Sequence, residues 1–163
     1  MKSNLLTVVF ISGFIIGCNN NEQSKNVEGK WIKGDKNEQI ETIETHFQGF
    51  GKAMWEVSYR FKELYVAGEN ENWGYADHHI HELQEAIELG LERRPEHKRA
   101  ATQFLTVSIP EMKQAIEQSN KDLFDDKYEA MRQSCNACHV IRNHEYIKVK
   151  TPTEYYSIVG KAD

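Results

Sequence analysis

Five consecutive residues, Cys135-Asn136-Ala137-Cys138-His139, carry the clearest chemistry in the sequence. Two cysteines that are separated by two residues and followed directly by a histidine form the pattern of a covalent c-type haem site. The two thiols add to the vinyl groups of haem as thioethers, and a nitrogen of the histidine binds the iron. Residues three apart lie on the same side of a helix, so both sulfur atoms can reach one porphyrin edge. The motif predicts one haem c, attached through Cys135 and Cys138, with His139 as the proximal iron ligand.

Two other chemistries use closely spaced cysteines, and each needs more than this motif supplies. A zinc site needs further ligands, for which His144 is the nearest candidate on the same predicted helix. Dithiol redox chemistry is typical of a βαβ context, which the sequence lacks. The chain has only three cysteines, which is not the even set of a disulfide framework.

The third cysteine, Cys18, ends a different signal. Lys2 precedes an apolar run over 5–17, which is too short and too abruptly ended for a transmembrane helix. The run closes with Ile-Ile-Gly before Cys18, which resembles the lipobox of bacterial lipoproteins. That resemblance implies a signal peptide over 1–17, cleavage before Cys18 and a lipid on its thiol. An ordinary signal peptide and an uncleaved anchor are the alternatives.

The composition indicates a single acidic domain. With 20 Lys+Arg against 25 Asp+Glu, the formal net charge is −5. This balance argues against a nucleic-acid-binding class, for which a basic patch is expected, and it is compatible with a basic redox partner. The polar residues 18–30 read as a flexible tether. We expect one haem-binding domain over 31–147 and a C-terminal tail over 148–163.

The first helical segment is expected over about 37–67, where apolar residues recur in steps of three and four. This seam is the strongest periodic signal in the chain. Asp35 is the predicted N-cap, with Glu38 three residues on, as in a capping box. The seam consists of Ile40, Ile43, Phe47, Phe50, Met54, Val57, Phe61 and Leu64.

Three further helical segments are expected over about 73–93, 96–119 and 123–144. Pro110 falls inside the third, and we expect one kinked helix there because the apolar face continues past it. Four amphipathic helices with short loops, and no sustained strand, predict an all-α antiparallel four-helix bundle. The haem motif then lies on the last helix.

No methionine follows Met131, so a distal methionine ligand has to come from upstream of the motif. In this the chain resembles the cytochrome c-prime and cytochrome c-556 family, in which the haem motif lies on the last helix of a four-helix bundle. The resemblance covers about 37–144 and depends on Cys135, Cys138 and His139. The lipid-type N-terminus and the tail after His144 depart from the family.

The distal side of the haem is left open by the sequence. The resemblance implies Met54 as a candidate distal ligand, whereas a methionine at a seam is commonly a core filler. Without ligation, Met54 and its neighbours Phe47, Phe50 and Val57 form an apolar pocket beside five-coordinate iron. A bis-histidine site is a further alternative, although the candidate histidines are expected to be solvated or to cap the bundle: His78, His79 and His81. Haem propionates have four candidate partners, although each of the four is more readily explained as part of a solvated basic face around the last helix: Arg132, Arg142, Lys148 and Lys150.

The expected function is that of a lipid-anchored monohaem cytochrome that carries single electrons and is not an enzyme. The first alternative is a five-coordinate haem protein that binds or senses a small gas such as NO or CO. A third candidate is a structural lipoprotein without haem. We expect the protein in the cell envelope of a bacterium, facing the periplasm or on the outer membrane. Expected partners are redox proteins with a basic surface, the membrane through the lipid, and a second copy in a homodimer.

Overall fold

The computed structural model describes residues 29–153, and all regular structure within them is helical. The predicted all-α class is therefore confirmed. The described residues fall into two compact units, 29–41 and 42–153, and each is described by itself. Between residues 29 and 153, no helix is long and apolar enough to cross a membrane. Cys18 and the signal peptide expected over 1–17 lie outside the described residues, as does the tail beyond 153.

Helix α1 (Lys36–Phe47) begins as the sequence predicts. The Asp35 carboxylate accepts hydrogen bonds from the backbone N–H groups of Asn37 and Glu38, at 2.9 and 3.0 Å. The Glu38 carboxylate accepts in return from the N–H of Asp35 at 2.7 Å. This reciprocal pair is a capping box, which satisfies backbone donors that the first helical turn leaves without partners. Asp35 is thus confirmed as the N-cap.

The prediction of one helix over 37–67 is wrong, because the chain breaks between α1 and α2 (Phe50–Glu69). Gln48 adopts the left-handed conformation with φ 61°, and Gly49 is extended. The seam residues before the break are exposed: Ile40, Ile43 and Phe47. Those of the middle and end of α2 are buried: Val57, Phe61 and Leu64. The seam therefore contributes side chains to the core only within α2, although its three- and four-residue spacing continues across the break.

Two more long helices begin at asparagine caps. The Asn72 side chain accepts from the N–H of Tyr75 at the start of α3 (Trp73–Arg93), at 3.2 Å. The Asn120 side chain accepts from the N–H of Leu123 at the start of α6 (Lys121–Ile141), at 3.0 Å. Each cap satisfies a backbone donor at the helix end, which fixes where the helix begins. The predicted segments over 73–93 and 123–144 are confirmed within a few residues.

Between α3 and α6 the chain forms a short 3₁₀ turn (Pro95–His97), α4 (Lys98–Gln103), a π-helical turn (Phe104–Ser108) and α5 (Ile109–Glu117). Pro110 has no N–H and cannot donate to the carbonyl four residues earlier. The preceding turn is wider, since the N–H of Ile109 donates to the carbonyl of Phe104, five residues back. Helical structure thus continues through Pro110, as the sequence predicts. The π turn before Pro110 was not predicted.

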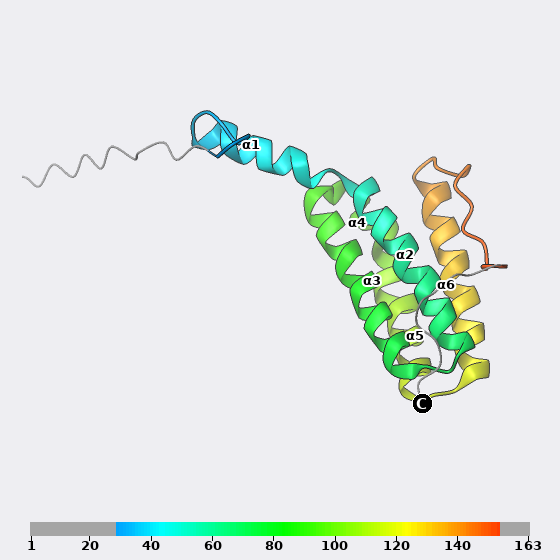
Figure 1. Cartoon of the computed structure of the whole chain (residues 1–163). Coiled ribbons are helices and arrows are strands. Elements are labelled where there is room, and N and C mark those ends of the chain that lie inside the picture. The colour runs from blue at the N-terminus through cyan, green and yellow to red at the C-terminus, as the bar shows by residue number, and fades with distance from the viewer. Residues whose placement is uncertain (1–28, 154–163) are drawn as a thin grey trace, which may run out of the picture. The chain divides into compact units, whose positions relative to one another are not determined.

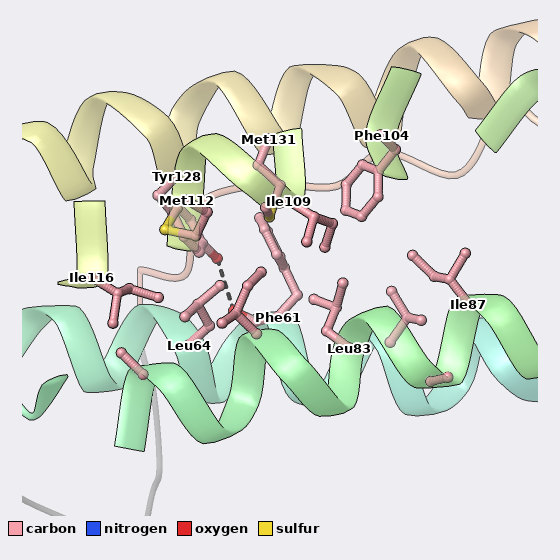
Figure 2. Close-up of a cluster of buried hydrophobic side chains, with 14 of the residues drawn as sticks. Phe61, Leu64, Leu83, Ile87, Phe104, Ile109, Met112, Ile116, Tyr128 and Met131 are labelled. Atoms are coloured by element: carbon pink, nitrogen blue, oxygen red, sulfur yellow. Dashed lines mark hydrogen bonds between the residues drawn. The ribbon is translucent and has the colours of Figure 1, made fainter. Parts of the chain in front are cut away.

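Helices α2, α3, α5 and α6 lie side by side (Figure 1), and their buried side chains form one hydrophobic core. Helix α3 packs against α2 and α5, and α6 packs against α5 and α2. Figure 2 shows how the buried side chains from these helices meet. The ring of Tyr128 on α6 stacks on Phe61 of α2, with centroids 4.3 Å apart. The Tyr128 hydroxyl donates to the Phe61 carbonyl at 3.2 Å, which satisfies the one polar atom of a buried ring.

Gly68 on α2 lies directly against α6, because a Cβ built there would overlap the buried ring of Phe124. We expect Gly68→Ala to lower the free energy of unfolding by about 1–3 kcal/mol, the usual cost of overpacking. Gly51 on the same helix is the matched control, since a Cβ there meets nothing within 4 Å. Gly51→Ala should leave stability unchanged or slightly higher. Urea denaturation measures both variants, and an equal effect at the two positions would contradict this packing.

Candidate functional site

A pocket of about 1420 Å³ opens within residues 42–153, beside the C-terminal end of α6. Its walls come from α2, the end of α3, the turn Pro95–His97, α4, α6 and the segment that follows α6. Cys135, Cys138 and His139 all line it, so the structure brings the three predicted haem residues to one cavity. Pockets for small organic ligands usually measure about 300–1,000 Å³. The volume is therefore sufficient for a cofactor that is larger than most small organic ligands.

Cys135 and Cys138 are free thiols, one turn apart on α6. Burial raises the pKa of Cys135 to about 12, and burial also raises the pKa of Cys138. Both thiols therefore keep their protons at neutral pH. Reactive dithiols work in the opposite sense, because the thiolate is the nucleophile and a lowered pKa supplies it. These surroundings do not favour the dithiol redox alternative.

His144, the residue expected to complete a zinc site, has its Nδ1 3.2 Å from the Tyr146 hydroxyl. Residues 29–153 contain no group of three or more His, Cys, Asp or Glu side chains placed to hold a metal ion. A haem iron differs from a zinc ion in that the porphyrin contributes four nitrogen ligands of its own. One protein nitrogen in the right protonation state is then a sufficient contribution from this side of the ring.

His139 meets that requirement. Its Nδ1 lies 2.9 Å from the carbonyl oxygen of Ile147. A carbonyl oxygen can only accept a hydrogen bond, so Nδ1 carries the proton and Nε2 carries the lone pair. Metal-binding histidines commonly donate their other N–H to a carbonyl or carboxylate, which fixes the tautomer and raises the basicity of the ligand nitrogen. The donor set therefore fits haem iron.

The segment after α6 reverses direction and packs along α6 beside the haem motif. The Asn136 Oδ1 accepts from the N–H of Val149 at 2.8 Å, and the Asn136 Nδ2 donates to the carbonyl of Val149 at 2.9 Å. The Arg132 Nη1 donates to the same carbonyl at 2.9 Å, and its guanidinium also pairs with Glu129. Arg132, predicted as a propionate partner, is thus engaged with the tail instead.

Met54 lies on α2, lines the pocket and is partly buried at the edge of the core. Phe50 and Val57 line the pocket with it, as expected for a distal side. Phe47 was predicted to join them, and this is wrong, because it lies on α1 beyond the Gln48 break and is 61% exposed. The structure therefore brings Met54 and two of its three predicted neighbours to the cavity.

His97 also lines the pocket, although no sequence pattern indicates this. Its ring stacks on Phe50, with centroids 4.4 Å apart and an interplanar angle of 13°. Burial, and next the positive charge of Arg142, lower the pKa of His97. The only nearby sequence signal is Pro95, which marks a turn but does not say which side chain of that turn faces inward.

The histidines at the start of α3 lie elsewhere. His78 and His81 are exposed, as predicted, but His79 is only 1% exposed, so its expected solvation is wrong. Its ring packs edge-on against Tyr59 and Tyr75. Neither ring nitrogen has a hydrogen-bond partner among the described residues, and burial lowers the pKa of His79 to about 4. His79 is therefore a neutral core residue.

The pocket is basic although the whole chain is acidic. Two glutamates line it, Glu56 and Glu96, against seven basic residues: Lys52, Lys62, Arg93, Arg94, Arg142, Lys148 and Lys150. Lys62 pairs with Glu63, whereas the other six have no carboxylate partner among residues 29–153. Glu56 is itself paired with Arg60 at 3.2 Å. The excess of unpaired positive charge fits a ligand that carries carboxylates, as haem does.

Comparisons with known proteins add no relative to this description. No protein-family model, no curated protein and no solved structure matches the chain.

Proposed function

We propose that this chain is a lipid-anchored c-type cytochrome with one covalently bound haem, which carries single electrons and is not an enzyme. The observation that carries the proposal is that Cys135, Cys138 and His139 line one basic pocket while His139 donates its Nδ1–H to the Ile147 carbonyl. When bound, haem supplies a reversible one-electron exchange at its iron. The chain supplies attachment, axial ligands and a cavity that limits access of water.

In this proposal the motif residues have separate roles. The Cys135 and Cys138 sulfur atoms form the two thioethers, and the Nε2 lone pair of His139 binds the iron. The Met54 thioether would supply a second iron ligand from α2.

We also propose that the four packed helices form an antiparallel bundle of the cytochrome c-prime and c-556 type. Phe124 lies against Gly68 near the end of α2, while Tyr128, one turn further along α6, contacts Phe61. Advancing along α6 thus means going back along α2, which is the sense of an antiparallel pair.

The same register supports Met54 as the distal ligand. Tyr128 and Phe61 are paired, and both helices rise about 1.5 Å per residue. Seven residues further along α6 is Cys135, and seven residues back along α2 is Met54. The two positions are therefore expected at the same level, on helices that both line the pocket.

The lipid on Cys18 completes the proposal, although Cys18 lies outside the described residues. It holds the protein at the bacterial cell envelope, facing the periplasm or on the outer membrane, with residues 18–30 as the tether. The net charge of −5 predicts a basic redox partner. The unpaired basic residues around the pocket favour an acidic partner surface instead, because a partner has to approach the haem and not the average of the whole surface.

A second function, binding of a small gas, is favoured by the apolar side chains beside Met54. Phe50, Val57 and Phe61 line the pocket, and they would surround an open sixth position if Met54 did not bind the iron. The iron would then be five-coordinate and accessible to NO or CO.

One set of spectra separates these functions. The chain is produced together with haem-maturation machinery, and the haem content is measured after denaturation. We expect haem to stay on the denatured chain, with low-spin spectra in both oxidation states that carbon monoxide does not change. High-spin spectra that shift with carbon monoxide would favour gas binding. Absence of covalent haem would contradict both functions and leave a structural lipoprotein.

A further inference from the structure

We propose that Asn136 is a positioning residue for His139, and that it acts through the segment after α6. Asn136 is one of the two residues between the cysteines, where the attachment chemistry itself prescribes no side chain. The inference rests on the proposed function in so far as His139 binds iron. Its structural part, a clamp between Asn136 and Val149, can be tested whether or not haem is bound.

The clamp begins with the turn that ends α6. The N–H of Asn143 donates to the Val140 carbonyl at 3.1 Å, and the N–H of His144 donates to the His139 carbonyl at 2.7 Å. Asn143 itself is left-handed, with φ 58°. These two bonds and this conformation define a Schellman motif, which satisfies the last carbonyls of a helix and reverses the chain. The backbone after His144 is thereby sent back towards His139.

Three side-chain bonds then hold the returning chain on α6. The Asn136 amide makes two of them, because it accepts from the Val149 N–H and donates to the Val149 carbonyl. Arg132 contributes the third, to the same carbonyl at 2.9 Å. A primary amide is suited to this position because it offers one acceptor and two donors on one rigid plane. Val149 also packs against the core, so its backbone N–H, its carbonyl and its side chain are all held.

Between the turn and the clamp lies the Ile147 carbonyl, which accepts from His139 Nδ1. Ile147 is 46% exposed, and its N–H donates to the carbonyl of His144 at 2.8 Å. Its carbonyl is therefore positioned by backbone anchors on both sides rather than by burial of its own side chain. Asn136 supplies the anchor on the C-terminal side, two residues away, and so keeps the acceptor of His139 in place.

This acceptor matters for the ligand chemistry of His139. With Nδ1–H donated to a carbonyl, Nε2 is the unprotonated nitrogen and is more basic. A stronger nitrogen donor stabilises the oxidised iron more than the reduced iron. Loss of the clamp is therefore expected to raise the reduction potential and to weaken the hydrogen bond on His139 Nδ1.

The first measurement is the rate of amide hydrogen exchange at Val149, which NMR monitors in the full-length protein with haem bound. We expect Asn136→Ala to speed the exchange of the Val149 amide by about tenfold to a hundredfold, since two hydrogen bonds are lost. Asn136→Asp keeps the acceptor for the Val149 N–H and loses the donor to the carbonyl, so it should fall between. Gln133→Ala is the matched control, because this exposed amide on α6 donates to Glu129 and makes no hydrogen bond to the segment 142–153.

The second measurement is the reduction potential together with the His139 Nδ1–H signal in the reduced protein. We expect a higher potential and a weakened or faster-exchanging Nδ1–H signal in Asn136→Ala, a smaller change in Asn136→Asp and none in Gln133→Ala. A faster Val149 amide with an unchanged potential and unchanged Nδ1–H would show a purely structural clamp and overturn the positioning role. Unchanged Val149 exchange would overturn the clamp itself.

Failure of the proposed function is visible separately. If the purified wild-type chain carries no covalent haem, the same exchange comparison is made on that haem-free full-length chain. Faster Val149 exchange in Asn136→Ala would then support the clamp while the haem function fails. Covalent haem, together with equal Val149 exchange in Asn136→Ala and Gln133→Ala, would support the haem function and contradict the clamp.

Discussion

Replacing Met54 by alanine is expected to convert a low-spin iron into a high-spin iron that binds carbon monoxide. The thioether sulfur is the only group of Met54 that can bind iron, and alanine removes it entirely. Met54 lines the pocket from α2, at the level expected for Cys135 on α6. Visible absorption spectra of the oxidised and reduced protein, with and without carbon monoxide, measure the change.

Two further variants separate ligation from packing. Met54→Leu keeps the apolar volume at the edge of the core and should cost less than about 1.5 kcal/mol in stability. It is nevertheless expected to give the same spectra as Met54→Ala, because leucine has no donor atom. His97 also lines the pocket and has ring nitrogens that could bind iron, so His97→Ala is the control. This variant should leave the spectra low-spin. A spectral change in His97→Ala, with none in either Met54 variant, would identify His97 as the ligand and contradict the prediction.

The helices that hold the candidate site were largely predictable from the sequence. The segments over 73–93 and 123–144 combine a steady apolar spacing with clear ends, such as Pro95 after the first of them. Phe124, Tyr128 and Met131 precede the cysteines at alternating spacings of four and three residues, which is typical of one helix face, and all three are buried. The capping box of Asp35 and Glu38 is a local device of four residues, so short-range chemistry was sufficient to locate it.

Features that depend on contacts between distant segments were not predictable. The apolar seam of the first segment continues through Gln48 and Gly49, because spacing does not record whether the backbone stays helical. His97 enters the pocket through stacking on Phe50, which lies 47 positions away in the chain. The pairing of Asn136 with Val149 joins a motif to a tail that has no periodicity. In each case tertiary packing, rather than local propensity, decides the outcome.

Charge gives a related lesson about scale. The net charge is a property of the whole chain, and it predicted a basic partner. The structure gathers unpaired basic residues, among them Arg94, Lys148 and Lys150, around the pocket. At physiological salt the screening length is about 8 Å, so a partner at the pocket responds to these nearby groups more than to distant carboxylates. The distribution of charge can thus reverse the preference that its sum indicates.

Electron exchange with small charged reagents is expected to reveal this local charge. The rate of oxidation of the reduced protein by anionic hexacyanoferrate(III) should fall as ionic strength rises from 10 to about 200 mM, because salt screens an attraction. For a cationic oxidant such as tris(phenanthroline)cobalt(III), the rate should rise over the same range. Two haem propionates and Glu96 would offset three of these charges and leave a net positive charge, since six of the lining basic residues have no carboxylate partner among residues 29–153.

Neutralising two of these residues tests the assignment directly. Lys148→Gln combined with Lys150→Gln is expected to slow the anionic reagent at low salt by about three- to tenfold, and to speed the cationic one. Lys113→Gln combined with Lys127→Gln makes the same change in net charge on α5 and α6, at two lysines that do not line the pocket. If net charge governed the approach, both double variants would change the rates equally. A rate with hexacyanoferrate(III) that rises with salt in the wild type would instead support a basic partner, because the protein would then repel anions at the haem itself.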